Sequence, residues 1–291
     1  MASAIELDLP PEIIDLEDFT ETINILCHAD TGGGKTVLWA DLPDILILAI
    51  EEGTISAKRR LPPPKKGQLR KVWRIKRWPD LVEAYEWLRD HEDHPFKWVM
   101  LDSITKAQNM CIRHIMENVV KANPSRDPKI PAQGDHFKWQ LTMKDLVSDF
   151  NELPVNTVWL ARSMVKEDPD GNDIVVPLIE GKDYGISAWV CGEMHLLCYL
   201  KKVRKGTGDS ARTVRKLYTN EHSMYWCKDR YDALPHVMEF KEPAGVALKI
   251  IKMINESGGS REAATETRRK TNTTPPKKRK SAAARTKRRT A

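Results

Sequence analysis

A glycine-rich segment near the N-terminus constrains the fold of this chain more than any other feature. It follows the apolar run 23–27 and reads ADTGGGKT. Its residues are Ala29, Asp30, Thr31, Gly32, Gly33, Gly34, Lys35 and Thr36. Glycines let the backbone curl so that N–H groups point at phosphate oxygens, and a helix beginning near Lys35 would add its positive dipole end. Lys35 would reach the β- and γ-phosphates and Thr36 would ligate Mg²⁺, so the segment predicts a P-loop that binds a nucleoside triphosphate.

A second apolar run supports this site. Residues 97–103 read KWVMLDS, which places Asp102 at the C-terminal tip of an expected buried parallel strand. In nucleotide-binding α/β sheets the ligand lies at that edge. We therefore expect Asp102 to hold Mg²⁺ through a water and complete the shell that Thr36 begins, with ATP as the nucleotide.

Composition limits the class of protein. The chain has 291 residues, of which 41% are hydrophobic and 30% charged, as in a globular protein. We expect no membrane association, because no run approaches the roughly 18 apolar residues that a span needs. The acidic N-terminus resembles neither a signal nor a transit peptide, and five scattered cysteines fit reduced thiols, so we expect a cytoplasmic protein. Cys191, His195 and Cys198 match no common zinc spacing, and packing is the simpler interpretation.

The net charge of +6 is distributed unevenly. Residues 261–291 contain 12 Lys and Arg against two Glu, a net of +10, which leaves −4 for the rest of the chain. Residues 258–291 have almost no large apolar side chains, so we expect a disordered basic tail that contacts nucleic acid through phosphates. The run PPKKRK also resembles a nuclear import signal, although such runs arise readily in any basic tail.

Between the tail and an acidic leader (1–20), residues 21–257 alternate between strand and helix patterns. The expected strands are 23–27, 45–50, 72–75, 98–101 and 155–161. Expected helices begin at Pro79 and after Ser103 as a cap, and a third carries Trp139 and Phe150 on its apolar face. This order predicts one α/β domain with a mainly parallel sheet and helices on both faces. Residues 195–203 and 213–219 flank a glycine-containing turn and predict an antiparallel hairpin.

Three further groups of residues occupy informative positions. Asp102 lies 67 positions after Lys35, and the interval contains two strand candidates, which leaves room for a strand inserted between the P-loop strand and the Asp102 strand. The first candidate ends in Glu51-Glu52-Gly53, which could be a catalytic carboxylate or two surface acids in a turn. The strand after Asp102 ends in Arg162-Ser163, and WCKDRY further on contains Lys228 and Arg230.

This order of features resembles the bacteriophage RecA-like ATPases of the Sak single-strand-annealing group, over roughly residues 23–254. The resemblance implies that Glu51, with Glu52 as the reserve, activates the attacking water as a base. It implies that Arg162 or Ser163 senses the γ-phosphate, where relatives more often carry His, Gln or Asn. Lys228 and Arg230 resemble a Lys-x-Arg element whose cations reach the neighbouring subunit's nucleotide, which implies a homo-oligomeric ring or filament; an ordinary solvated charge cluster is the alternative.

The resemblance also implies a path for single-stranded DNA along two expected loops, 121–135 and 164–184. Neither loop is strongly basic, so a cationic group near the hairpin is an additional candidate, unless it is ordinary solvated charge. Its members are Lys201, Lys202, Arg204, Lys205, Arg212, Arg215 and Lys216. Tryptophans could stack on bases, but Trp39, Trp87, Trp98 and Trp159 lie in patterned elements and are expected in the core.

The sequence therefore predicts an ATPase with a RecA-like core that handles single-stranded DNA in annealing or recombination. Two alternatives remain open at this level. One is a DNA-binding module gated by nucleotide with little hydrolysis, and the other is a P-loop kinase of a small substrate.

Overall fold

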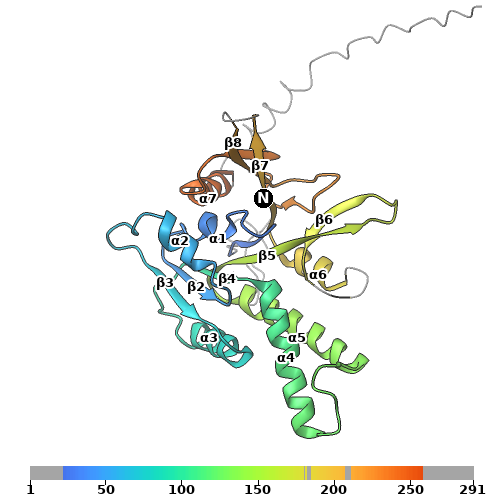
Figure 1. Cartoon of the computed structure of the whole chain (residues 1–291). Helices are drawn as coiled ribbons and strands as arrows, with labels where there is room; N and C mark the ends of the chain where they lie inside the picture. The colour runs from blue at the N-terminus through green and yellow to red at the C-terminus, as the bar shows by residue number, and fades with distance from the viewer. Residues whose placement is uncertain (1–21, 180, 182–184, 207–210, 258–291) are drawn as a thin grey trace, which may run out of the picture.

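The protein is described by a computed structural model that covers residues 22–179, 181, 185–206 and 211–257 (Figure 1). The predicted acidic leader and basic tail lie outside these described residues. Within them, no helix is long and apolar enough to cross a membrane.

A mixed sheet runs through the centre of the domain, and its strands follow the order β10-β8-β7-β1-β5-β4-β2-β3. The parallel strands are β1 (Asn24–Ala29), β2 (Ile45–Ala49), β3 (Arg70–Arg74), β4 (Trp98–Asp102), β5 (Asn156–Glu167) and β7 (Leu196–Lys205). Antiparallel to their neighbours are β6 (Asp173–Pro177), β8 (Arg212–Tyr218), β9 (Lys228–Asp229) and β10 (Val237–Phe240). The predicted hairpin is thus confirmed as β7–β8.

Helices cover both faces of the sheet, as the strand–helix alternation predicts (Figure 1). One face carries α3 (Trp78–Asp90), α4 (Ile104–Ala122), α5 (Gln133–Glu152) and α6 (Gly185–Glu193). The other carries α1 (Lys35–Trp39), α2 (Thr54–Arg60) and α7 (Val246–Ser257). Because strand side chains alternate, Leu26 packs into the first core while Ile25 and Cys27 pack into the second. These two apolar layers make the central strands continuous hydrophobic runs.

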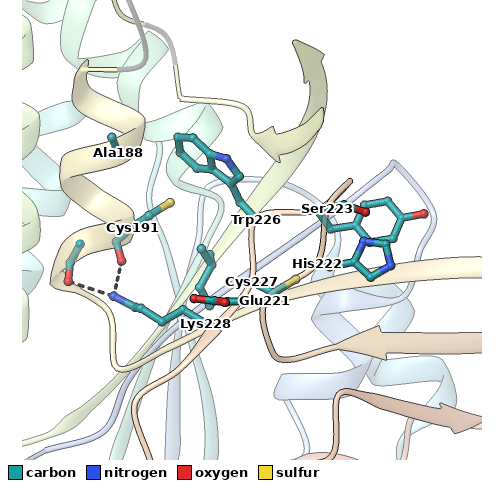
Figure 2. Close-up of a pocket in the computed structure, with 11 residues that line it drawn as sticks. Ala188, Cys191, Glu221, His222, Ser223, Trp226, Cys227 and Lys228 are labelled. Carbon is teal, nitrogen blue, oxygen red and sulfur yellow. Dashed lines mark hydrogen bonds between the residues drawn. The ribbon is translucent and has the colours of Figure 1, made fainter. Parts of the chain in front are cut away.

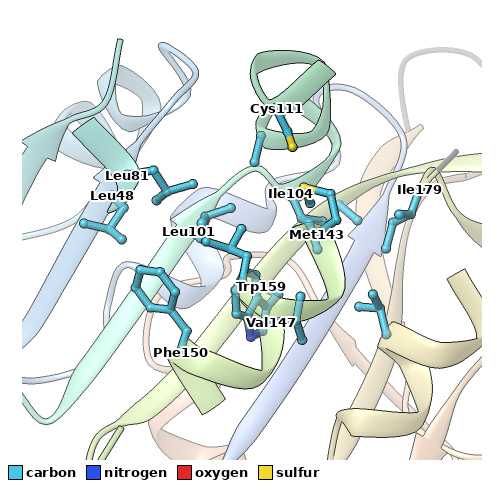
Figure 3. Packing of buried hydrophobic residues seen from close by; sticks show 14 of the residues in the cluster. Leu48, Leu81, Leu101, Ile104, Cys111, Met143, Val147, Phe150, Trp159 and Ile179 are labelled. Carbon is cyan, nitrogen blue, oxygen red and sulfur yellow. The ribbon is translucent and has the colours of Figure 1, made fainter. Parts of the chain in front are cut away.

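The larger core forms where α4 and α5 meet the sheet (Figure 3). Trp159 of β5 is 1% exposed and lies edge-on to Phe150 of α5, with ring centroids 5.8 Å apart. Trp39 and Trp98 are also buried, and Trp87 packs against the core. The prediction that these tryptophans are core residues is confirmed for Trp39, Trp98 and Trp159, whereas Trp87 is only partly buried.

In the sheet, the strand that lies between β1 and β4 is neither of the two strands that lie between Lys35 and Asp102 in the sequence. It is β5, which follows Asp102 in the sequence and pairs in parallel with both β1 and β4. The two interval strands, β2 and β3, lie beyond β4. Spacing along the chain shows that extra strands exist but does not fix their order in the sheet, because crossover helices can place a strand on either side.

The prediction that residues 164–184 form a loop is wrong over most of their described length. β5 continues to Glu167, and β6 returns antiparallel to it, so the segment is largely a hairpin. A tight turn at its tip explains the return: Asp168 accepts from the Gly171 N–H at 3.0 Å, and Gly171 has a positive φ of 82°. The first expected loop is shorter than predicted, since α4 ends at Ala122 and α5 begins at Gln133.

Candidate nucleotide site

The glycine-rich segment joins β1 to α1, as expected of a P-loop. Gly32 and Gly34 have φ values of 78° and 106°, which side chains with a Cβ rarely adopt. The Gly33 N–H donates to the Asp30 carbonyl at 3.1 Å and closes the loop. Lys35 folds back across it and donates to the Ala29 carbonyl at 2.9 Å. The loop is therefore shaped around the position that a phosphate takes.

Helix α1 spans only five residues, which is too short for the dipole contribution to phosphate binding that we expected from the sequence. Phosphate binding must depend mainly on the loop N–H groups and on Lys35, not on a long helix dipole. Burial lowers the pKa of Lys35, while the Asp102 and Glu51 carboxylates oppose that shift. A phosphate would add negative charge beside this ammonium and stabilise its protonated form.

The two predicted magnesium ligands lie in contact. The Thr36 hydroxyl donates to the Asp102 carboxylate, with Oγ1 and Oδ2 2.8 Å apart. Burial raises the pKa of Asp102 to about 6, partly offset by the bond from Thr36. Gly53 closes the site, since a Cβ there would stand 2.9 Å from Asp102 Oδ2 and 3.0 Å from Thr36 Oγ1. A hydroxyl and a carboxylate converging at the loop fit the oxygen ligands that Mg²⁺ prefers.

Glu51 projects from the end of β2 toward the same place. Its carboxylate accepts from the Ser103 hydroxyl at 2.5 Å and from Arg162 Nη2 at 2.9 Å. Burial raises the pKa of Glu51, but these two bonds outweigh it and leave the pKa below its ordinary value. Glu52 is exposed. Ser103 precedes α4 as predicted, yet its side chain does not cap the helix, because the hydroxyl holds Glu51 instead.

The two sensor candidates have different partners. Arg162 contacts Glu51, and its backbone N–H donates to the Thr105 hydroxyl at 3.0 Å, which fixes the strand tip. Ser163 lies 3.0 Å from Nδ1 of the buried His28. Nε2 of His28 lies 3.0 Å from the Trp226 carbonyl, which can only accept, so Nε2 carries the proton and Nδ1 accepts from Ser163. Of the two candidates, only Arg162 makes a contact with the expected base.

One predicted DNA contact is wrong. Arg215 is 7% exposed and cannot belong to a solvent-facing cationic surface. Its Nε donates to the Gly33 carbonyl at 3.1 Å, and its Nη1 donates to the Lys241 carbonyl at 2.5 Å. Arg215 shares a strand face with Leu217, which packs in the core, because side chains alternate along β8. The guanidinium therefore hydrogen-bonds to the P-loop and does not form part of a DNA-binding surface.

Lys228 and Arg230 lie at the opposite end of the sheet from the P-loop. Lys228 pairs with Leu197 near the start of β7, whereas the P-loop follows the end of β1. Lys228 Nζ donates to the carbonyls of Cys191 and Gly192 at 2.7 and 3.1 Å (Figure 2), and Arg230 Nη2 donates to the Gly192 carbonyl at 2.6 Å. Both cations therefore satisfy terminal carbonyls of α6 and lie away from the nucleotide site of their own chain.

The cysteines are packing residues. All five are buried and free, and Cys191 lines a cavity of about 690 Å³ beside Trp226 and Lys228 (Figure 2). His195 Nδ1 accepts from the Asn24 N–H at 3.3 Å. Within the described part of the chain, no group of three or more His, Cys, Asp or Glu side chains is placed to hold a metal ion.

The fold and this constellation define a P-loop NTPase domain. A comparison with family models agrees: the model described as an AAA domain matches residues 21–231. Since that match covers more than half of the 291 residues, the chain belongs to this AAA-domain family of P-loop nucleotide-binding proteins. The comparison with curated proteins found no match.

Three residues of the nucleotide site are not assigned to that site by the sequence-based prediction. Ser103 and Gly53 stand next to predicted residues, and their roles depend on contacts between strand ends. Arg215 lies 182 positions from Gly33. Alternation along its strand, with Leu217 apolar, was the one signal that could have placed Arg215 on the core face.

Proposed function

We propose that this protein is an ATPase that binds single-stranded DNA and acts in annealing or recombination, in the manner of the phage RecA-like ATPases that its motifs resemble. The observation that carries the hydrolytic part is the position of Glu51. It lies at the strand edge with Lys35, Thr36 and Asp102, and two donors fix its carboxylate. A fixed, ionised carboxylate beside a phosphate cradle is what a water-activating base requires.

Each residue then has a defined task. Lys35 and the loop N–H groups bind the β- and γ-phosphates of ATP. Thr36 and Asp102 would hold Mg²⁺. Mg²⁺, when bound, neutralises charge that develops on the phosphate oxygens. Glu51 orients the attacking water and accepts its proton.

Arg162 fits the sensor role through its contact with Glu51. Its side chain is 45% exposed, and its ion pair with Glu51 measures 2.9 Å. A γ-phosphate carries more negative charge than one carboxylate and would compete for this guanidinium. We propose that Arg162 turns from Glu51 to the γ-phosphate, which frees Glu51 to bind water and links the base to the presence of triphosphate.

The outer face of the β7–β8 hairpin supports the DNA-binding part of the proposal. Four of the seven predicted cations share this face in two cross-strand pairs, Lys201 with Lys216 and Lys205 with Arg212. Glu239 pairs with Lys205, which reduces the charge of the second pair. The cations adjoin an aromatic group, since Lys201 donates to the Tyr225 hydroxyl at 2.9 Å.

The aromatic group itself contains Tyr199, Tyr218, His222 and Tyr225. His222 is exposed and stacks on Tyr225 with centroids 4.4 Å apart. Tyr199 and Tyr225 are buried, so the exposed ring that this group offers to a base is His222, beside cations that would contact phosphates. Lys202 and Arg204 point to the opposite face, and the basic tail adds sequence-independent phosphate contacts.

ATPase assays with and without single-stranded DNA test the proposal. Hydrolysis that DNA stimulates supports it. Tight DNA binding that depends on ATP without turnover would instead favour a nucleotide-gated binding module, and phosphate transfer to a small molecule would favour a kinase. Electron microscopy with single-stranded DNA and a non-hydrolysable ATP analogue tests the associated proposal that the active form is a ring or filament.

A further inference from the structure

Arg215 makes a contact that the P-loop motif does not assign. It reaches the loop from β8, and its Nε donates to the Gly33 carbonyl at 3.1 Å. A second bond, from Nη1 to the Lys241 carbonyl, anchors the guanidinium just after β10. The side chain is buried and its bond to Gly33 lies out of water, where a hydrogen bond is stronger, whereas the bond to Lys241 is part-buried. Arg215 therefore ties the hairpin end of the sheet to the centre of the loop.

This bond sets the orientation of one peptide unit. In a trans peptide the C=O and the following N–H point in opposite directions. When Arg215 holds the Gly33 carbonyl on the β8 side, the Gly34 N–H must point to the other side of the loop, where a phosphate binds. Two consecutive glycines form this peptide, so their own backbone preferences oppose a flip only weakly. The loop needs an external constraint to keep this N–H aimed correctly.

Gly34 is adapted to the same contact. Its φ of 106° favours glycine, and a Cβ at this position would stand 3.0 Å from Arg215 Nε. The guanidinium thus occupies the space that a side chain would fill. A flipped peptide would turn the Gly33 carbonyl toward the phosphate, where oxygen would face oxygen. It would also leave the buried guanidinium without one of its acceptors.

We infer that Arg215 is a positioning residue that fixes the Gly33–Gly34 peptide and so prepares the P-loop for the phosphates of a nucleotide. The inference concerns nucleotide binding alone, so it rests on that part of the proposed function and does not depend on DNA. It also distinguishes Arg215 from its sequence neighbour Lys216, whose side chain points to the outer face of the hairpin.

The test compares R215M and R215K with R89M as the matched control, since Arg89 is exposed at the end of α3 and pairs with Asp90. Methionine keeps most of the apolar volume of arginine but removes its donors. Lysine keeps the charge but has one nitrogen and cannot bridge the carbonyls of Gly33 and Lys241 together. Affinity for a fluorescent ATP analogue is measured for each variant without DNA, beside the melting temperature of the nucleotide-free protein.

R215M should bind the analogue about 10- to 100-fold more weakly than wild type, since a hydrogen bond from a charged donor is lost. R215K should recover part of this loss, with a smaller fall in melting temperature than R215M, and R89M should bind as wild type. In steady-state assays KM should rise more than kcat falls, because the bond shapes the cradle and does not touch the reacting atoms.

Wild-type affinity in R215K and R215M would overturn the inference, as would an equal loss in R89M. If R215M does not fold, R215K decides: wild-type affinity in a folded R215K refutes the positioning role. Failure of the wild-type protein itself to bind the analogue would instead refute the proposed nucleotide site.

Discussion

Gly53 offers a sharp test of the magnesium site, because a single methyl group added there meets both proposed ligands. Its φ and ψ of −57° and −28° are helical, so alanine fits the backbone without strain. The added Cβ would stand 2.9 Å from Asp102 Oδ2 and 3.0 Å from Thr36 Oγ1. Optimal contacts between heavy atoms lie near 3.5 to 4.0 Å, so at least one oxygen must move.

The magnitude follows from the bond that this movement breaks. Thr36 and Asp102 are 2.8 Å apart, and Asp102 is 4% exposed at the tip of a core strand, so its carboxylate has little room to retreat. A hydrogen bond to a charged group contributes about 1.5 to 3 kcal/mol. G53A should therefore weaken binding of the magnesium–nucleotide complex by about 10- to 100-fold. Folding stability should fall, because losing the Thr36–Asp102 bond outweighs the about 0.4 to 1 kcal/mol gained when alanine restricts the unfolded chain.

Calorimetric titration of nucleotide with Mg²⁺ and again with EDTA separates the metal contribution from the rest of the site. The loss in G53A should appear with Mg²⁺ and largely disappear with EDTA, since Lys35 and the loop remain intact. G134A is the matched control, because a Cβ at Gly134 in the first turn of α5 meets no atom within 4 Å. Equal affinity of G53A and wild type with Mg²⁺, or an equal loss in EDTA, would refute this placement of the metal.

The other expected outcomes concern the base, the subunit contact, a buried histidine and the tail. E51Q should bind ATP but not turn it over, because an amide cannot take the proton; loss of turnover in E52Q instead would reassign the base. Mixing E51Q with R230A should restore part of the ATPase activity in assemblies shown to be mixed, and no recovery would exclude a shared site. Burial lowers the pKa of His28 to about 4, so between pH 4 and 6.5 the unfolded chain binds more protons than the folded one. From pH 7 to 5 the unfolding free energy of the wild type should thus fall by about 2 kcal/mol more than that of H28Q in denaturant titrations; an equal fall in H28Q would contradict this. Deleting residues 258–291 should flatten the salt dependence of DNA binding, because 12 Lys and Arg are lost; an unchanged slope would place DNA binding in the body.

Local signals predicted the parts of the site that depend on local geometry. The P-loop needs glycines at positive φ followed by Lys35 and Thr36, so a short run of consecutive residues is enough to predict it. Asp102 was found because an apolar run that ends in an acid predicts a strand tip at the ligand edge. The helices on both faces were found for a similar reason, since their apolar positions repeat with the helical period.

Contacts between distant segments could not be read in the same way. Arg162 and Glu51 are 111 positions apart, and their ion pair exists only because β5 and β2 flank β4. The strand order was itself not fixed by spacing. Composition misled in one place: residues 164–184 have the polar and acidic content of a loop, but Asp168 and Gly171 form the turn of a hairpin. A turn motif between alternating segments is a hairpin signal that outweighs polarity.

The separation of Glu51 from Arg230 bears on how subunits would assemble. Glu51 lies at the carboxyl ends of the parallel strands, whereas Arg230 donates to the end of α6 beside the start of β7. A cation at one end can meet a nucleotide at the other only if the carboxyl end of one subunit faces the amino end of the next. Such a head-to-tail contact uses two different surfaces and generates a ring or a filament, not a two-fold dimer. Arg230 is exposed and has one acceptor to release, whereas Lys228 is half-buried between two carbonyls, so the trans-acting role we propose falls first on Arg230.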